Sequence, residues 1–143
     1  MRVLGIDFGE RRIGLALSDA SGTLASPVGV LGGAHRAGDP VSLVLAALAD
    51  LAHDEPIARI VVGLPRRLDG RDSEQTPRVR RFAAELHARS GLPIDLQDER
   101  LTSHEADARL ALRERDWRKR KARLDAAAAA VILQDWLDER HDG

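Results

Sequence analysis

Three acidic residues stand where the sequence predicts strands to end or a helix to begin, and they point most directly to chemistry. Asp7 lies near the end of the apolar run 3–9, which predicts a strand. Glu99 follows another short predicted strand, and Asp125 opens an alanine-rich helical segment. An aspartate inside such a run costs free energy unless it is paired or holds a cation. Without cysteine or a histidine cluster, these carboxylates would favour Mg²⁺ or Mn²⁺ over zinc.

Each acid also has a purely structural interpretation. Asp7 could cap the turn that follows the strand, because aspartate before glycine is common there. Glu99 could pair with Arg100 in an ordinary loop. Asp125 could complement a helix dipole, although its helical spacing places it on the same stripe as the apolar residues that follow. If the three acids meet, their repulsion raises their pKa values unless a divalent cation neutralises them.

Such cations activate water and stabilise the leaving oxygen in phosphodiester cleavage. The distribution of charge along the chain also provides basic side chains that could bind phosphates. The chain carries a net charge of −1. Residues 113–123 hold seven basic and two acidic side chains, and residues 66–81 hold six arginines and three acids. Two basic segments on an otherwise acidic chain indicate contact with a polyanion. The basic residues expected to bind substrate are Arg12, Arg66, Arg67, Lys119, Arg120 and Lys121.

The predicted elements place the acids on one α/β domain that spans residues 1–143. Three strands with short turns predict an antiparallel unit, and the later strands alternate with helices, so the sheet is mixed. Gly5 and Gly9 beside Asp7 are interpreted as clearance for a substrate, and Trp136 as a core residue. The predicted strands are 3–9, 13–18, 27–31, 57–63 and 94–97, and the predicted helices are 40–52, 73–90, 102–112 and 124–140.

Composition limits the class of protein. The chain of 143 residues is 43% hydrophobic and 31% charged, which suits one folded domain with a water-facing surface. It has no cysteine, which excludes disulfides and thiolate metal sites and fits a reducing cytoplasm. The first predicted strand leaves no room for a signal peptide, and the longest apolar run, 126–133, is too short to cross a bilayer. We therefore expect a cytoplasmic protein without a membrane partner.

Four segments resemble one known family in order and over nearly the whole chain. They are GIDFGERRIGLALSD, VVGLPRRLDGRDSEQTPRVRRFA, DERLTSHEA and RKARLDAAAAAVILQDWL. They are similar to the YqgF/RuvX family, whose members are described as pre-16S ribosomal RNA nucleases and Holliday-junction-resolvase-like proteins. The resemblance implies a ribonuclease H-like fold, with the family's acidic triad on Asp7, Glu99 and Asp125. It also implies a role in processing the 5′ end of precursor 16S ribosomal RNA during ribosome biogenesis.

Three alternatives stay open at this point. The same chemistry could act on a branched DNA junction, which calls for a two-fold dimer with two sites, so either a monomer or a homodimer is expected. A non-catalytic RNA-binding or transcription factor could retain the fold without metal-dependent turnover. Residues 5–14 also resemble the first phosphate loop of the actin and sugar-kinase superfamily, although those enzymes close two domains over a nucleotide.

Overall fold

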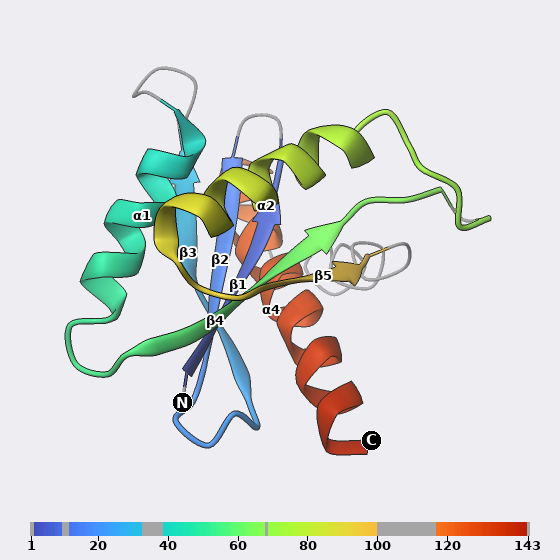
Figure 1. Ribbon diagram of the computed structural model, residues 1–143. Helices are drawn as coiled ribbons and strands as arrows, with labels where there is room; N and C mark the ends of the chain where they lie inside the picture. The colour runs from blue at the N-terminus through green and yellow to red at the C-terminus, as the bar shows by residue number, and fades with distance from the viewer. Residues whose placement is uncertain (1, 10–11, 33–38, 68, 100–116, 143) are drawn as a thin grey trace.

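In this computed structural model, the chain forms a five-stranded sheet with helices on both faces (Figure 1). The structure describes residues 2–9, 12–32, 39–67, 69–99 and 117–142, and in the last helix it describes the side chains of residues 126–140. The elements are β1 (Arg2–Phe8), β2 (Arg12–Ser18), β3 (Ala25–Gly32), α1 (Pro40–Leu51), β4 (Ile57–Leu64), α2 (Thr76–Ser90), β5 (Ile94–Asp98) and α4 (Trp117–Asp142).

The strand order β3-β2-β1-β4-β5 confirms the predicted mixed sheet. β1, β2 and β3 form antiparallel pairs, whereas β4 runs parallel to β1 and β5 runs parallel to β4. The carboxyl ends of β1, β4 and β5 therefore lie along one edge of the sheet, and β2 begins at the same edge. We call this edge the carboxyl edge. It is where Asp7 and Glu99 come to lie.

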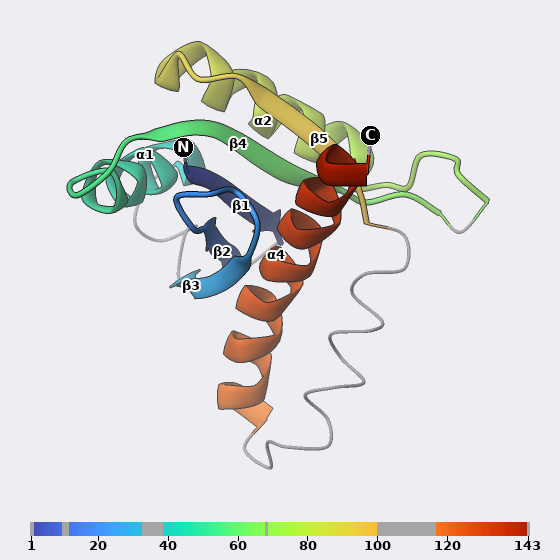
Figure 2. The ribbon, with the colours of Figure 1, turned by 90° about the horizontal axis from the view of Figure 1, so that it is seen from below.

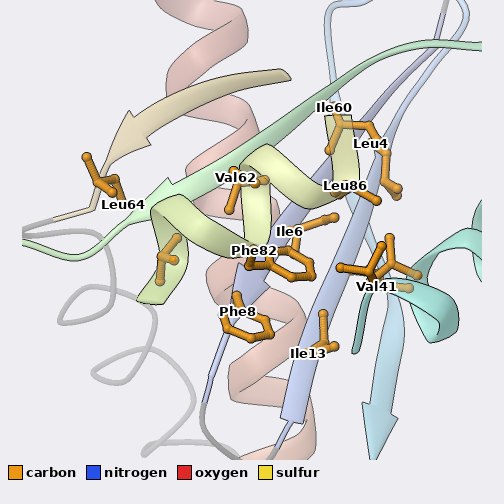
Figure 3. Packing of buried hydrophobic residues seen from close by; sticks show 14 of the residues in the cluster. Leu4, Ile6, Phe8, Ile13, Val41, Ile60, Val62, Leu64, Phe82 and Leu86 are labelled. Carbon is orange, nitrogen blue, oxygen red and sulfur yellow. The ribbon is translucent and has the colours of Figure 1, made fainter. Parts of the chain in front are cut away.

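The sheet has two different faces, because successive side chains of a strand point to opposite sides. α1 and α2 cover one face and α4 crosses the other (Figure 2). Leu4, Ile6 and Phe8 of β1 pack on the α1/α2 side (Figure 3). Val3 packs with Ala129 on the α4 side. The predicted alternation along the first strand is thus confirmed.

The ends of two helices follow the expected local signals. Asp39 caps α1 by accepting a hydrogen bond from the Ser42 backbone N–H at 2.9 Å, and Pro40 occupies the first turn. α2 ends at Gly91, which adopts a left-handed conformation (φ 74°) and donates its N–H to the His87 carbonyl at 3.0 Å. Among the described helices, none is long and apolar enough to span a bilayer.

Two predicted helix starts need correction. α2 begins at Thr76 rather than Ser73, because the preceding residues form a turn in which Thr76 Oγ1 accepts the Ser73 N–H at 2.8 Å. α4 begins at Trp117 rather than Leu124, since the intervening Lys, Arg and Ala residues are strong helix formers. The predicted helix 102–112 lies outside the described residues.

Trp136 is not the core residue that the sequence suggested. Its side chain is half-buried at the edge of the interface between α4 and β5. The indole Nε1 donates to Asp95 Oδ2 at 2.9 Å, and the Arg140 guanidinium lies 4.6 Å from the ring centroid. An indole with a polar N–H gains more at such a boundary, where the N–H reaches an acceptor, than in a fully apolar core.

Candidate functional site

Two of the three predicted acids meet at the carboxyl edge. Asp7 is the penultimate residue of β1, and Glu99 directly follows β5. The backbone N–H of Glu99 donates to the Leu64 carbonyl at 3.2 Å, which ties this residue to the end of β4. Since β4 pairs with both β1 and β5, two residues 92 positions apart in sequence are brought to the same edge of the sheet. Strand ends hold such side chains more rigidly than loops do.

Both carboxylates belong to the α4 side of the sheet. Asp7 shares its strand face with Val3 and Gly5, which lie against α4. The Glu99 carboxyl group lies directly over Gly63 of β4. A methyl group at Gly63 would stand 2.5 Å from Glu99 Oε2 and 2.6 Å from Ile132 Cδ1, too close for any real contact. Glycine at position 63 therefore makes the space that the Glu99 side chain occupies.

Burial, and then repulsion between carboxylates, set the electrostatics of the site. Burial raises the pKa of Glu99 to about 8, and the Asp7 carboxylate adds to the rise through its charge and a hydrogen bond. The charge of Asp98 raises the pKa of Glu99 further. A carboxyl group that stays protonated at neutral pH indicates a site with too little nearby positive charge to stabilise its carboxylate form. Perturbed acids of this kind are typical of functional sites.

The donor set fits a hard divalent cation. Carboxylate oxygens are the ligands that Mg²⁺ and Mn²⁺ prefer, and a cation would relieve the repulsion between Asp7 and Glu99. Within the described part of the chain, no group of three or more acidic, histidine or cysteine side chains gathers closely enough to hold an ion. The described residues thus bring together two of the three predicted acidic ligands.

The third predicted acid, Asp125, is a residue of α4. Its backbone is part of the described helix, but its side chain lies outside the described residues. Ala129 and Ile132, which the sequence places on the same helical stripe, are fully buried against the sheet. Ile132 reaches the Gly63–Glu99 contact itself. The described part of the stripe is thus buried against the sheet, with Ile132 beside Glu99, while the role of Asp125 stays a prediction.

Three of the predicted substrate-binding arginines lie at the carboxyl edge. Arg12 opens β2, its carbonyl accepts the Gly9 N–H at 2.9 Å, and its side chain is half-buried. Arg66 and Arg67 follow β4 by two and three residues. The side chains of Lys119, Arg120 and Lys121 lie outside the described residues, although their backbone belongs to α4. Their proposed contact with substrate stays a prediction.

Arg66 and Arg67 belong to the loop of residues 65–73, which extends away from the end of β4 (Figure 1). Arg66 forms a short antiparallel bridge with Asp72, and its Nε lies 4.0 Å from Asp72 Oδ1. The Arg67 N–H donates to the Arg71 carbonyl at 2.8 Å, while the Arg67 side chain is exposed. The loop therefore carries an exposed cation on a hydrogen-bonded backbone.

The sequence suggested that Gly5 provides clearance for a substrate, and this prediction is wrong. A methyl group at Gly5 would stand 2.7 Å from Leu133 Cβ and 3.2 Å from the Ala129 carbonyl oxygen. The space above Gly5 is therefore filled by α4, whose small residues allow the helix to approach the sheet closely. Gly9 instead closes the turn to Arg12.

Sequence reasoning overlooked two residues here, Gly63 and Arg78. Arg78 lies in the first turn of α2, and its guanidinium carbon is 4.5 Å from the Phe8 ring centroid. Its Nη2 donates to the Gly9 carbonyl at 3.3 Å. A signal existed for both: Gly63 interrupts a β-branched run, and Arg78 stands four residues before the buried Phe82, on an otherwise apolar stripe.

Comparison with known proteins agrees with this architecture. The sequence model of the RuvX family, described as "Holliday junction resolvase", matches residues 1–139. A protein of Anaeromyxobacter dehalogenans (strain 2CP-1 / ATCC BAA-258), described as "Putative pre-16S rRNA nuclease", is 44% identical over 98% of both chains. A protein of Maridesulfovibrio salexigens with the same description is 43% identical over 96% of this chain and 98% of its own.

Solved structures share the fold at low sequence identity. RuvC of T. thermophilus, solved in complex with a Holliday junction substrate, superposes with a TM-score of 0.55 at 17% identity and covers 99% of this chain and 96% of its own. The fowlpox virus Holliday junction resolvase gives a TM-score of 0.53 at 11% identity, covering 98% and 99%. These matches confirm the predicted α/β fold of the ribonuclease H-like, RuvC type. With the family model spanning nearly every residue and relatives matching end to end, the chain belongs to the RuvX family.

Proposed function

We propose that this protein is a divalent-metal-dependent nuclease that hydrolyses phosphodiester bonds at the 5′ end of precursor 16S ribosomal RNA. The observation that carries the proposal is the Asp7–Glu99 pair, two acids that meet at the carboxyl edge, with the Glu99 carboxyl group over Gly63. Family membership supports the nuclease class, and the descriptions of the relatives support the RNA substrate.

In the proposed mechanism, Asp7, Glu99 and Asp125 would hold Mg²⁺ or Mn²⁺. When bound, such a cation lowers the pKa of water and offsets the charge that develops on the phosphate. Gly63 leaves room for the Glu99 carboxyl group, and Ile132 beside it limits the access of bulk water to that carboxyl. Arg12, Arg66 and Arg67 would contact substrate phosphates along the carboxyl edge, and Lys119, Arg120 and Lys121 would extend the contact.

The central test is Asp7→Asn, assayed on a precursor RNA that carries the unprocessed 5′ extension, in Mg²⁺. We expect the cleavage rate to fall about a thousandfold, because a bound cation contributes several kcal/mol to such reactions. The matched control is Asp54→Asn, an exposed acid in the turn that precedes β4, at the opposite end of the sheet. Full activity of Asp7→Asn, with contaminating nuclease excluded, would show that the proposed mechanism is wrong.

A branched DNA junction is the second candidate substrate, because the family model itself is described as a Holliday junction resolvase. Parallel assays of precursor RNA and a synthetic four-way junction separate the two substrates. A resolvase is also expected to behave as a two-fold dimer in ultracentrifugation, since it must cut two strands.

A non-catalytic RNA-binding factor is the third outcome of the same experiments. It would bind RNA in a salt-sensitive manner, and this binding would survive the loss of all three acids.

Metal binding can be measured without turnover: addition of Mn²⁺ at pH 8 should raise the melting temperature of the wild type more than that of Glu99→Gln.

A further inference from the structure

Two contacts hold the half-buried side chain of Arg78 at the end of β1. Its guanidinium lies over the Phe8 ring at 4.5 Å, and its Nη2 donates to the Gly9 carbonyl at 3.3 Å. Phe8 is itself fixed, because it stacks on Phe82 with ring centroids 4.1 Å apart and an interplanar angle of 7°. The Arg78 side chain therefore loses its conformational freedom before any ligand arrives.

No acid among the described residues neutralises the charge of Arg78. Two other arginines of α2 face acids: Arg80 lies 3.8 Å from Asp72, and Arg89 lies 3.0 Å from Asp39. Among the described residues, Arg78 makes no ion pair, and a neutral carbonyl accepts its one hydrogen bond. A guanidinium has five N–H donors. Most of these donors are thus left for a partner that the described protein residues do not supply.

The position of Arg78 relative to the acids suggests that partner. Gly9 follows Asp7 by two residues, so the guanidinium lies at the same carboxyl edge as the acid pair. The acids approach this edge from the α4 side of the sheet, whereas Arg78 approaches it from the α2 side. A nucleic-acid backbone crossing the edge would meet the acids with one phosphate and Arg78 with another.

We infer that Arg78 is a phosphate-binding residue of the proposed nuclease, held at the end of β1 by Phe8 and Gly9 so that it contacts a phosphate beside the one that is cleaved. The inference rests on the proposed function. Arginine suits this role because its planar fork can stack on a ring and still present N–H donors to phosphate oxygens in its own plane. Lysine at this position would keep the charge but lose both the stacking and the fork.

The test compares Arg78→Met, Arg78→Lys and wild type in binding a fluorescently labelled RNA stem-loop, in EDTA, over a series of salt concentrations. Methionine keeps apolar cover on Phe8 and removes only the charge and its hydrogen bonds. We expect Arg78→Met to weaken binding about tenfold and to lower the slope of log K against log salt by about 1. Arg78→Lys should retain the slope and recover part of the affinity. In Mg²⁺, Arg78→Met should raise KM about tenfold and change kcat less than threefold.

The matched control is Arg89→Met at the other end of the same helix. Arg89 binds Asp39 and Ser42 of the α1 N-terminus, so its loss should lower the melting temperature without changing RNA affinity or the salt slope. An unchanged affinity and slope in Arg78→Met, while Asp7→Asn is inactive, would overturn the inference and leave the proposed function standing. Wild-type protein that binds neither RNA nor DNA would overturn both.

Discussion

The two faces of the sheet are built from different residues for different purposes. On the α1/α2 face, large side chains such as Leu4, Ile6 and Phe82 fill a thick apolar layer (Figure 3). On the α4 face, glycine and alanine let the helix approach the strands so closely that Gly5 has no room for a methyl group. The acid pair stands at the end of this second, thinner layer.

The difference shows how one strand can serve stability and chemistry at once. Alternation along β1 sends Ile6 and Phe8 into the thick layer and Asp7 to the opposite face. Well-packed large residues hold the strand in place. Small residues on the other face leave space where carboxylates can meet instead of being filled by hydrocarbon. The same strand therefore provides a rigid support for a repulsive pair of acids.

Among the variants that compare the two faces, Gly63→Ala is expected to have the largest effect, and that effect is on activity. The added methyl group must displace the Glu99 carboxyl and the end of Ile132, both of which can move because they are ends of side chains. We expect cleavage to fall at least about a hundredfold, as misplaced catalytic groups do, while the free energy of unfolding changes by less than about 1 kcal/mol. Gly29→Ala on β3, where nothing lies within 4 Å, is the matched control. Normal cleavage by Gly63→Ala would argue against a fixed position for Glu99.

Ile6→Ala tests the thick layer. Ile6 is fully buried, so its truncation should lower the free energy of unfolding by about 2–5 kcal/mol through lost burial and a cavity. Urea denaturation measures this loss. The kcat per folded molecule, measured well below the melting temperature, should stay within twofold of wild type. A large fall in kcat at unchanged stability would mean that the two faces do not divide their tasks as described.

Gly5→Ala tests the close approach of α4. Unlike the methyl group at position 63, this one meets Leu133 Cβ and the Ala129 backbone oxygen, which cannot move without the helix. Overpacking of this kind should destabilise the protein by about 1–3 kcal/mol in a thermal or urea melt. Stability equal to that of Gly29→Ala would show that α4 shifts away from the sheet at no cost.

The smallest expected effect is on the pH dependence of stability without divalent cations. The folded-state pKa of Glu99 is raised to about 8 from its ordinary 4.5, so the folded state binds more protons between these values. Stability is therefore retained below pH 4.5 and lost as the pH rises through about 8. We expect a loss on the order of 1–2 kcal/mol across this pH range. In EDTA, Glu99→Gln should lack this component, and identical pH profiles would contradict the assignment.

Much of the fold could be predicted because its signals are local. Alternating apolar residues in β1, the Asp39–Pro40 start of α1 and Gly91 at the end of α2 each depend on neighbours a few positions away. The starts of α2 and α4 were wrong because helix boundaries depend on which of several competing hydrogen bonds forms. The prediction that Trp136 is a core residue was wrong because the hydrogen-bond acceptor of its indole, Asp95, lies on another element.

The sequence alone determined which chemical groups are available: carboxylates without cysteine, and basic segments that could bind a polyanion. It also determined an order of strands and helices that implies a mixed sheet. Only the tertiary structure decided that Asp7 and Glu99 meet and that Gly63 makes the space for the Glu99 side chain. It also decided that α4, rather than a substrate, fills the space above Gly5. The physical reason is that contacts between residues far apart in the chain depend on strand order and on how closely a helix packs. Neither is encoded in any single stretch of residues. Asp7 was recognisable from its own strand, but what it faces was set by β4, β5 and α4 together.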